Sequence, residues 1–279
     1  MIAVLGGLGA AVFWAGAMLT ASRATRLVAP SSALAGVMLT GLVVVAPLAV
    51  AGGVPDGLGA PELGWLALAG LGNVVGLLLN YGALRVGKVA IVGPISSTEG
   101  AIAAVLAVVA GETLGAGVGV TLGVIAVGVV LAGITPGGGS GDPLRATLLA
   151  CGAALSFGVG LYATARVSDA LPLVWALVPA RVLGVAIIAL PLLATRKLHL
   201  TRAALPLVVA SGLCEVAGFT CYAVGSREGI AVAAVLGSQF AAVAAVAAYV
   251  LFHERLTRLQ VAGVATIAVG VAVVSALQA

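Results

Sequence analysis

Ten apolar stretches divide this sequence, and each is about as long as the ~20 residues that a helix needs to cross a bilayer's hydrocarbon core. Of the 279 residues, 62% are hydrophobic and 8% are charged, which leaves too little polar surface for a soluble domain. The stretches do not alternate between polar and apolar residues, so we expect an all-α polytopic membrane protein with ten transmembrane helices. The predicted spans are residues 2–21, 31–52, 62–85, 88–111, 115–135, 144–165, 172–194, 203–226, 229–252 and 257–277.

A linker at residues 136–143 separates five spans from five spans, because its glycines and prolines stop one helix and delay the next. Residues 1–135 and 144–279 are therefore interpreted as two five-helix units. An odd number of spans in each unit means that the second unit enters the membrane from the opposite side, which makes an inverted repeat.

The two predicted units also match in sequence when one is shifted by 142 residues. Residues 125–129 and residues 267–271 are both Ile-Ala-Val-Gly-Val, and Glu112 aligns with Glu254. Alanine, glycine and valine coincide easily in such a composition, so the glutamate match carries more weight. We interpret the agreement as an internal duplication.

Lysine and arginine are distributed unevenly between the predicted loops. The loops after odd-numbered spans hold ten of them, whereas the loops after even-numbered spans hold only Arg166 and Arg227. The positive-inside rule places the first set in the cytoplasm and both termini outside, with the protein in the cytoplasmic (inner) membrane. The basic residues lie singly in short loops, which is not the pattern of a nucleic-acid-binding protein.

Polar residues recur at one depth, near the centres of their predicted spans. They are Asn73, Glu99, Arg181, Glu215 and Gln239. A charge at mid-membrane costs several kcal/mol, and chains keep such groups mainly for transport. Two interpretations are open: a central substrate cavity between inverted repeats, which we favour, and a polar clamp between helices that contacts no substrate.

The balance of charge among these residues bears on mechanism. Two carboxyls face one guanidinium, so one acid remains unpaired, and a carboxyl that has lost its water shell can bind and release protons near neutral pH. Glu215 and Glu99 are both candidates for proton coupling. We expect Glu215 to face the substrate and Arg181 to pair with Glu99 or with a carboxylate of the substrate.

The fourth predicted span contains a further polar run. Ser96 is a candidate for the substrate site, and Pro94 just before it lacks the N–H of a regular helix, so a bend is expected there. The bend would act as a hinge or as a static kink. The second unit has Leu236 at the equivalent position, so any hinge is expected to be asymmetric.

Aromatic residues supply further candidates for cavity walls. Trp14 and Phe157 are equivalent in the repeat, and each lies mid-span in the first helix of its unit. Trp14 is kept as a substrate-site residue, although such rings also anchor helices at the membrane interface. Tyr81, Tyr162 and Tyr222 lie nearer helix ends and are assigned mainly to the interface.

Four other residues are given a structural interpretation. Glu112 and Glu254 each stand just before a predicted helix, where a carboxylate satisfies free N–H groups and the helix dipole. Gly119 and Gly123 form a small-xxx-small seam that is interpreted as internal packing rather than a dimer interface. The sequence leaves a monomer and a homodimer both open.

The chain resembles the ten-helix EamA-type members of the drug/metabolite transporter superfamily. The resemblance covers nearly the whole chain and rests on several weak motifs taken together. They are Trp14 in the first helix, Pro94 in the fourth, Arg181 in the seventh, and residues 111–114 and 253–256, which close the fourth and ninth helices. The chain departs from the family pattern at Leu236, where a second proline is expected, and at Met38, the counterpart of Arg181.

The resemblance implies export of amino acids, related metabolites or drugs by alternating access. A proton-coupled exporter of lipophilic cations would use the unpaired carboxyl as its substrate site, and a metabolite importer would share the architecture. The predicted spans contain no nucleophile with a base and no metal-ligand spacing, so we expect no enzyme, catalytic residue, cofactor or metal. Nothing resembles the repeated filter of a channel. The expected partners are a small-molecule substrate and the lipid bilayer.

Overall fold

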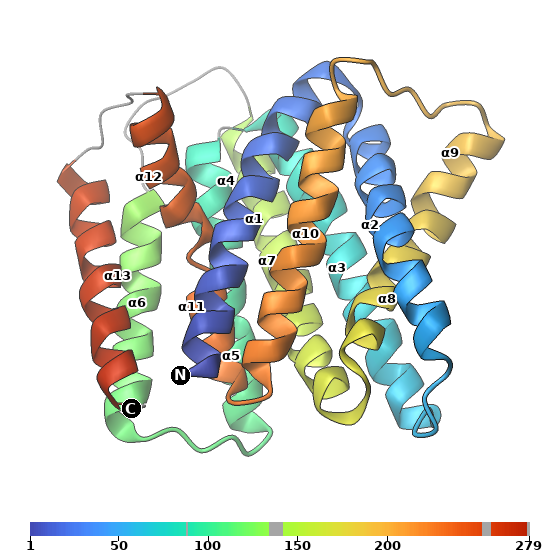
Figure 1. Ribbon diagram of the computed structural model, residues 1–279. Helices are drawn as coiled ribbons and strands as arrows, with labels where there is room; N and C mark the ends of the chain where they lie inside the picture. The colour runs from blue at the N-terminus through green and yellow to red at the C-terminus, as the bar shows by residue number, and fades with distance from the viewer. Residues whose placement is uncertain (88, 134–141, 253–257, 278–279) are drawn as a thin grey trace.

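The computed structural model describes residues 1–87, 89–133, 142–252 and 258–277. Every regular element within those residues is helical, and the helices run side by side along one direction (Figure 1). The first half contains α1 (Ile2–Leu27), α2 (Pro30–Gly52), α3 (Ala60–Val86), α4 (Val89–Ser96), α5 (Glu99–Val109) and α6 (Ala116–Gly133). The second half contains α7 (Pro143–Ala170), α8 (Leu173–Gly184), the π-helix η1 (Val185–Ala189), α9 (Leu190–Ala194), α10 (Leu205–Ser226), α11 (Ile230–Gly237), α12 (Phe240–Phe252) and α13 (Arg258–Leu277).

Every predicted span contains helical residues, but only some of the spans form one long, uninterrupted helix. Among the described residues, six helical segments are long and apolar enough to cross a membrane. The remaining spans correspond to shorter apolar helices. These six segments are Ile2–Leu27, Pro30–Gly52, Ala60–Val86, Leu144–Ala170, Leu173–Ala194 and Leu205–Ser226.

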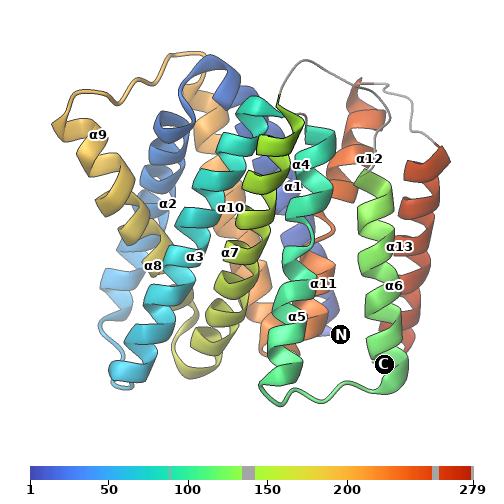
Figure 2. The same ribbon diagram turned by 180° about the vertical axis from the view of Figure 1, so that it is seen from behind.

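The helices form a bundle with two distinct edges. Helices α6 and α13 lie side by side at one edge, and α2, α8 and α9 lie at the other, in both views (Figures 1 and 2). Between these edges α1 packs along α10 and α3 packs along α7, while the pairs α4–α5 and α11–α12 run beside them. The centre of the bundle is therefore built from both halves of the chain.

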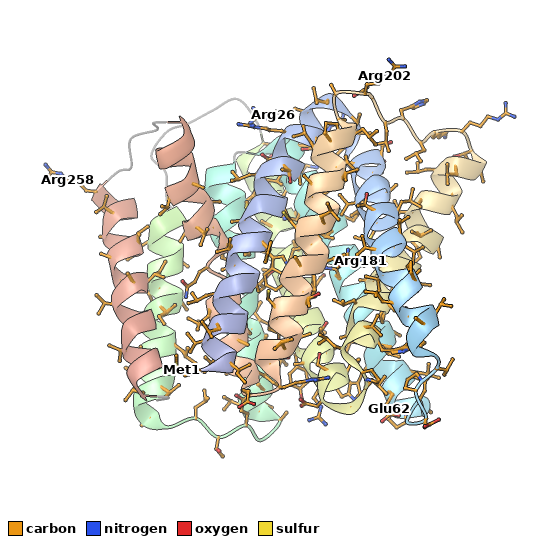
Figure 3. All side chains as sticks on the ribbon, in the orientation of Figure 1. Met1, Arg26, Glu62, Arg181, Arg202 and Arg258 are labelled. Atoms are coloured by element: carbon orange, nitrogen blue, oxygen red, sulfur yellow. The ribbon has the colours of Figure 1, made fainter. Side chains whose placement is uncertain are left out.

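The two ends of the bundle differ in the residues that they carry. Helix α1 begins and α13 ends at one of them, the terminal end. Arg26, Arg202 and Arg258 lie at the opposite, basic end, whereas Met1 and Glu62 lie at the terminal end (Figure 3). The three basic loop residues that are labelled in that view thus lie at one end of the molecule.

Two helices are broken at nearly equivalent positions of the two halves. Helix α4 stops at Ser96 and α5 starts at Glu99, while α11 stops at Gly237 and α12 starts at Phe240. The sequence led us to expect a bend just before Ser96 at Pro94, and any hinge to be asymmetric because the second half has Leu236 at that position. The second half lacks this proline, yet its helix breaks as well.

A side-chain hydroxyl bonds a helix carbonyl at each of the two breaks. The Thr98 hydroxyl donates to the Ile95 carbonyl at 2.7 Å in the first half. The Ser238 hydroxyl donates to the Val235 carbonyl at 2.9 Å in the second half. Such bonds offer helix carbonyls an alternative partner and so compete with the regular backbone ladder.

The predicted glycine seam on α6 does not pack inside the molecule. Nothing lies within 4 Å of a methyl group placed on Gly119 or Gly123. Helix α6 contacts α13 through another face, where a methyl group on Gly128 would lie 3.2 Å from the Gly263 carbonyl oxygen. The assignment of Gly119 and Gly123 to internal packing is therefore wrong, since they lie on a different face of the helix.

Candidate functional site

A partly open cavity of about 50 Å³ lies between α1, α3, α5, α7, α10 and α12. A volume of this size holds several water molecules or the polar part of a small ligand. On α1 its walls run from Trp14 to Ala21, and on α3 from Asn73 to Leu84. Those are the parts of α1 and α3 that lead to the basic end, so the cavity extends from mid-bundle toward that end.

The structure brings some of the predicted substrate-site residues together at this cavity and leaves others outside its walls. The residues that line it are Trp14, Asn73, Glu99 and Glu215. The residues that do not line it are Ser96, Arg181 and Gln239. The four lining residues come from α1, α3, α5 and α10, so both halves of the chain contribute.

Arg181 forms an ion pair with Glu215, not with Glu99. The Arg181 Nη2 atom lies 3.7 Å from Glu215 Oε2. Helix α8, which carries Arg181, packs mainly against α3 and α2 and also contacts α10, so Glu215 on α10 is the acid within its reach. The prediction that Arg181 pairs with Glu99 is therefore wrong.

The surroundings of Arg181 keep it behind Glu215. Its side chain is only 1% exposed, and its Nη1 atom lies 3.7 Å from the sulfur of Met38. Gly41 makes the space for this side chain, because a methyl group there would lie 2.6 Å from the Arg181 Cδ atom. The guanidinium carbon also lies 5.9 Å from the centre of the Phe219 ring. The guanidinium is thus enclosed by α2, α8 and α10.

Glu99 is the other acid of the cavity, and it differs from Glu215 in its partners. It stands in the first turn of α5, is 5% exposed and lines the cavity. No basic side chain in the described part of the chain forms an ion pair with it. Glu99, and not Glu215, is therefore the unpaired carboxyl that the sequence led us to expect.

Three cavity residues carry polar side-chain atoms that have no hydrogen-bond partner among the described residues. They are the indole nitrogen of Trp14, both amide atoms of Asn73 and the Oε2 atom of Glu215, and these residues are 6%, 3% and 6% exposed. An unmet buried donor or acceptor costs about 1–3 kcal/mol, so a molecule that satisfies these atoms would be stabilised. Gln239 also has an unpartnered Nε2 atom, although it lies in the break between α11 and α12 rather than on the cavity wall.

Asn80 and Tyr81 line the cavity, although the sequence analysis did not select them for the site. The Asn80 carbonyl oxygen accepts a hydrogen bond of 3.1 Å from Ser96, which ties Ser96 to the cavity wall. The Tyr81 hydroxyl lies 3.4 Å from that of Ser211. Asn80 lies seven residues after Asn73, and this spacing puts both on one face of α3, so helical periodicity could have found it.

The tyrosines do not all lie at the membrane interface. Tyr81 is 2% exposed and Tyr222 is fully buried, with its hydroxyl donating to the Leu161 carbonyl at 2.9 Å. Their assignment to the interface is wrong, since each is held inside the bundle by a polar partner. Tyr162 lies in an aromatic contact instead, 5.8 Å from the ring of Trp65.

Aromatic rings form much of the cavity wall. Trp14, Phe157, Phe219 and Phe240 all line it. The Trp14 and Phe219 rings meet edge to face with centroids 5.1 Å apart. Gly218 gives the indole its place, because a methyl group there would lie 2.5 Å from the Trp14 Nε1 atom. This arrangement holds the unpartnered indole nitrogen in a defined position.

At the terminal end two charged side chains, Arg227 and Glu112, form hydrogen bonds with backbone groups of other helices and loops. The Arg227 guanidinium donates to the Ser168 carbonyl at 2.8 Å and to the Leu171 carbonyl at 3.2 Å. These bonds fasten the connection between α10 and α11 to the end of α7. Arg227 therefore links neighbouring loops at that end.

Glu112 forms the second of these interactions, and it connects the two halves of the chain. Its carboxylate accepts from the Ala231 N–H at 3.3 Å, so it caps α11 rather than the helix that follows it in sequence. Gly111, at φ +104°, provides the turn that only glycine adopts easily. Burial raises the pKa of the Glu112 carboxyl, hydrogen bonds from the α11 backbone oppose the rise, and Asp169 adds to it. Glu254 lies outside the described residues.

Comparison with known proteins gives one family and one fold. The family model described as EamA-like transporter family matches residues 1–134 and 144–276. A solved crystal structure aligns over 99% of this chain and 96% of its own chain, with a TM-score of 0.79 and 21% sequence identity. At that identity the likeness shows the fold alone. No curated protein matches the sequence.

Proposed function

Because the chain belongs to the EamA-like transporter family, a family of multi-pass membrane transporters and not of enzymes, we propose that it exports small metabolites by alternating access. One observation carries this proposal. A cavity at the middle of the bundle is lined by Trp14, Asn73, Glu99 and Glu215 from both halves, and three of these residues carry polar atoms without a hydrogen-bond partner among the described residues. A transporter of this kind binds its substrate between two repeats near the bilayer midplane.

The proposed topology has ten transmembrane helices in two inverted five-helix repeats. Residues 1–135 form the first repeat, residues 136–143 the linker and residues 144–279 the second repeat. The common position of Arg26, Arg202 and Arg258 at the basic end supports a cytoplasmic location for that end, with both termini outside (Figure 3). The cavity then faces the cytoplasm, which is the loading state of an exporter in the cytoplasmic membrane.

Alternating access also needs an element about which the halves can move. The breaks between α4 and α5 and between α11 and α12 are candidates, because regular backbone bonding is interrupted in both. Pro94 stays a hinge candidate within the first of them. The broken helices meet where a methyl group on Gly100 would overlap the Ala234 carbonyl oxygen. Movement about that contact would close the basic end and open the terminal end.

The substrate class follows from the groups that face the cavity. Amino acids and other amine-bearing metabolites fit a site with two carboxyls, an amide and aromatic walls. A proton-coupled exporter of lipophilic cations is the second candidate, and the unpaired Glu99 favours it. A metabolite importer would have the same fold, and only the direction of transport separates it from an exporter.

Solute exchange in liposomes that contain the purified full-length chain tests the proposal. Liposomes loaded with an unlabelled amino acid or amine are expected to accumulate the same labelled compound faster than protein-free liposomes. Asn73→Leu should slow this exchange roughly tenfold, since the loss of one buried hydrogen bond to the substrate is worth about 1 kcal/mol or more.

The matched control is Thr121→Val on α6, whose hydroxyl bonds only to the Gly117 carbonyl of its own helix and does not line the cavity. This variant is expected to exchange solute at the wild-type rate. Exchange of no amino acid, amine or sugar by the wild-type protein would contradict the proposal, and so would full activity in Asn73→Leu.

A further inference from the structure

The cavity contains more acid than base, and this imbalance bears on the charge of its ligand. Glu99 and Glu215 both line the cavity, whereas Arg181 does not. Glu215 is engaged by Arg181 at 3.7 Å, and Glu99 has no ion pair within the described residues. The cavity therefore presents one carboxyl that no basic side chain among the described residues balances in an ion pair.

The guanidinium of Arg181 does not line the cavity. It is 1% exposed, lies among Met38, Gly41 and Phe219, and forms its ion pair with Glu215, which does line the cavity. A ligand carboxylate in the cavity would therefore lie beside two acids, with no basic side chain among the described residues that line it. Like charges at such short range repel by several kcal/mol in a poorly solvated site.

The walls favour a positive group as well. The rings of Trp14, Phe157, Phe219 and Phe240 line the cavity, and the face of an aromatic ring attracts a cation. The free carbonyl oxygen of Asn73 can accept a hydrogen bond from an ammonium group.

The free indole N–H of Trp14 imposes a second requirement. It can only donate, so it needs an acceptor on the ligand. A carboxylate would supply one at the cost of repulsion by the two acids, while a neutral carbonyl would supply one without it.

We propose that the cavity selects primary ammonium ions that carry an apolar or aromatic body and a neutral hydrogen-bond acceptor, with Glu99 as the counter-ion, and that it rejects the corresponding carboxylates. This inference rests on the proposed transport function and narrows its substrate class. Amides and esters of amino acids meet the description in full, whereas free amino acids, which the proposed function also admits, meet it only through their ammonium group and are expected to bind more weakly. Glu99 is then the residue that determines specificity.

Binding to the purified full-length chain, measured by calorimetry, tests the inference with four related probes. They are phenylalaninamide, phenethylamine, phenylalanine and 3-phenylpropionate. Phenylalaninamide is expected to bind most tightly, phenethylamine next because it lacks the acceptor, and phenylalanine roughly tenfold or more below the amide, with 3-phenylpropionate weakest.

Glu99→Gln should weaken phenylalaninamide binding at least roughly tenfold and remove most of the difference between the amide and the acid. The matched control is Glu228→Gln, an exposed carboxyl at the terminal end that lies outside the cavity. A thermal unfolding curve establishes that each variant is folded. The double variant Arg181→Gln/Glu215→Gln removes the enclosed pair together and should keep the order of the four probes, although its affinities fall.

The inference fails if phenylalanine binds as tightly as its amide, if the amide does not bind saturably, or if Glu99→Gln keeps the wild-type preference. Those results leave the transport proposal intact, because exchange of another solute in liposomes would still support it. Conversely, probes that bind in the expected order but are never exchanged across the membrane would contradict the transport function alone.

Discussion

The terminal end and the basic end of the bundle differ in what lies between their helices. At the terminal end backbones meet directly: a methyl group on Gly6 would lie 2.6 Å from the Gly225 Cα atom. Toward the basic end Gly93 instead faces a side chain, the flexible methyl of Met18, at 3.2 Å. Small residues let helices approach closely in a membrane, and close approach maximises dispersion contacts. The end without the cavity is thus also the end where the main chain itself is packed.

The hydrogen bonds made by charged side chains also differ between the terminal end and the basic end. Arg227 and Glu112 fasten loops and a helix start at the terminal end. The cavity reaches from Trp14 and Asn73 toward the other end. The terminal end is therefore closed by contact between helix backbones and by a few hydrogen bonds. The backbone contact and the hydrogen bonds can each be removed by a separate substitution.

The largest effect is expected at the crossing of α5 and α11. Gly100→Ala would place a methyl group against the Ala234 carbonyl oxygen and within 2.5 Å of the Ser238 hydroxyl, so the two helices must separate. Overpacking of this kind costs about 1–3 kcal/mol, which should appear as a lower thermal unfolding temperature. Gly93→Ala is the control, because the Met18 side chain can move aside. Equal unfolding temperatures for the two variants would show that the backbone contact at Gly100 is no tighter than the side-chain contact at Gly93.

A smaller effect is expected from Arg227→Ala. The change removes two hydrogen bonds to the carbonyls of Ser168 and Leu171, and bonds made by a charged group contribute about 1.5–3 kcal/mol each at most. Amide hydrogen exchange at the ends of α7 and α10 should become faster, while exchange near the basic end stays at the wild-type rate. Arg227→Lys should restore part of the protection. Unchanged exchange at the terminal end would mean that these hydrogen bonds do not hold it closed.

The smallest effect is expected from Glu112 and depends on pH. Its folded-state pKa is raised above the ordinary value of 4.5 because burial disfavours the carboxylate. The stability that this shift contributes is therefore fully present below pH 4.5 and is lost as the pH rises through the raised value. Thermal unfolding of the wild type between pH 4 and pH 7, about the range over which a shifted carboxyl titrates, should show this decline.

Glu112→Gln removes the titrating group and should flatten that part of the pH profile. Glu228→Gln, at an exposed site of the same end, should keep the wild-type profile. If the thermal stability of Glu112→Gln depends on pH as that of the wild type does, another group causes the loss of stability.

The deep polar residues could be located from the sequence because a membrane span has a simple geometry. Asn73, Glu99, Arg181 and Glu215 stand out in apolar stretches, and counting from the edges gives their depth. Depth does not specify which face of a helix meets which neighbour. The pairing of Arg181 with Glu215 depends on α8 lying against α10, and no local pattern in the chain encodes that contact.

The breaks in α4–α5 and α11–α12 show a second limit of prediction from sequence. Pro94 marks the first break in an obvious way. The second break has no proline and contains Ser238, a residue type that many unbroken helices also contain. Tyr81 and Tyr222 were misplaced for a related reason. A tyrosine near a helix end suits the interface equally well, and only the positions of Ser211 and of the Leu161 carbonyl show that both are held inside.

The contact between Arg181 and Met38 has a consequence for how such a chain could arise. The two residues are 143 positions apart, the separation that relates the start of one half to the start of the other, and their side chains touch at 3.7 Å. In an assembly of two identical subunits the same contact would set guanidinium against guanidinium. Fusion of the genes lets one copy keep the cation while the other acquires an uncharged thioether. A single polypeptide can therefore retain a solitary buried arginine at a spot where a symmetric ancestor would have had to hold two or none.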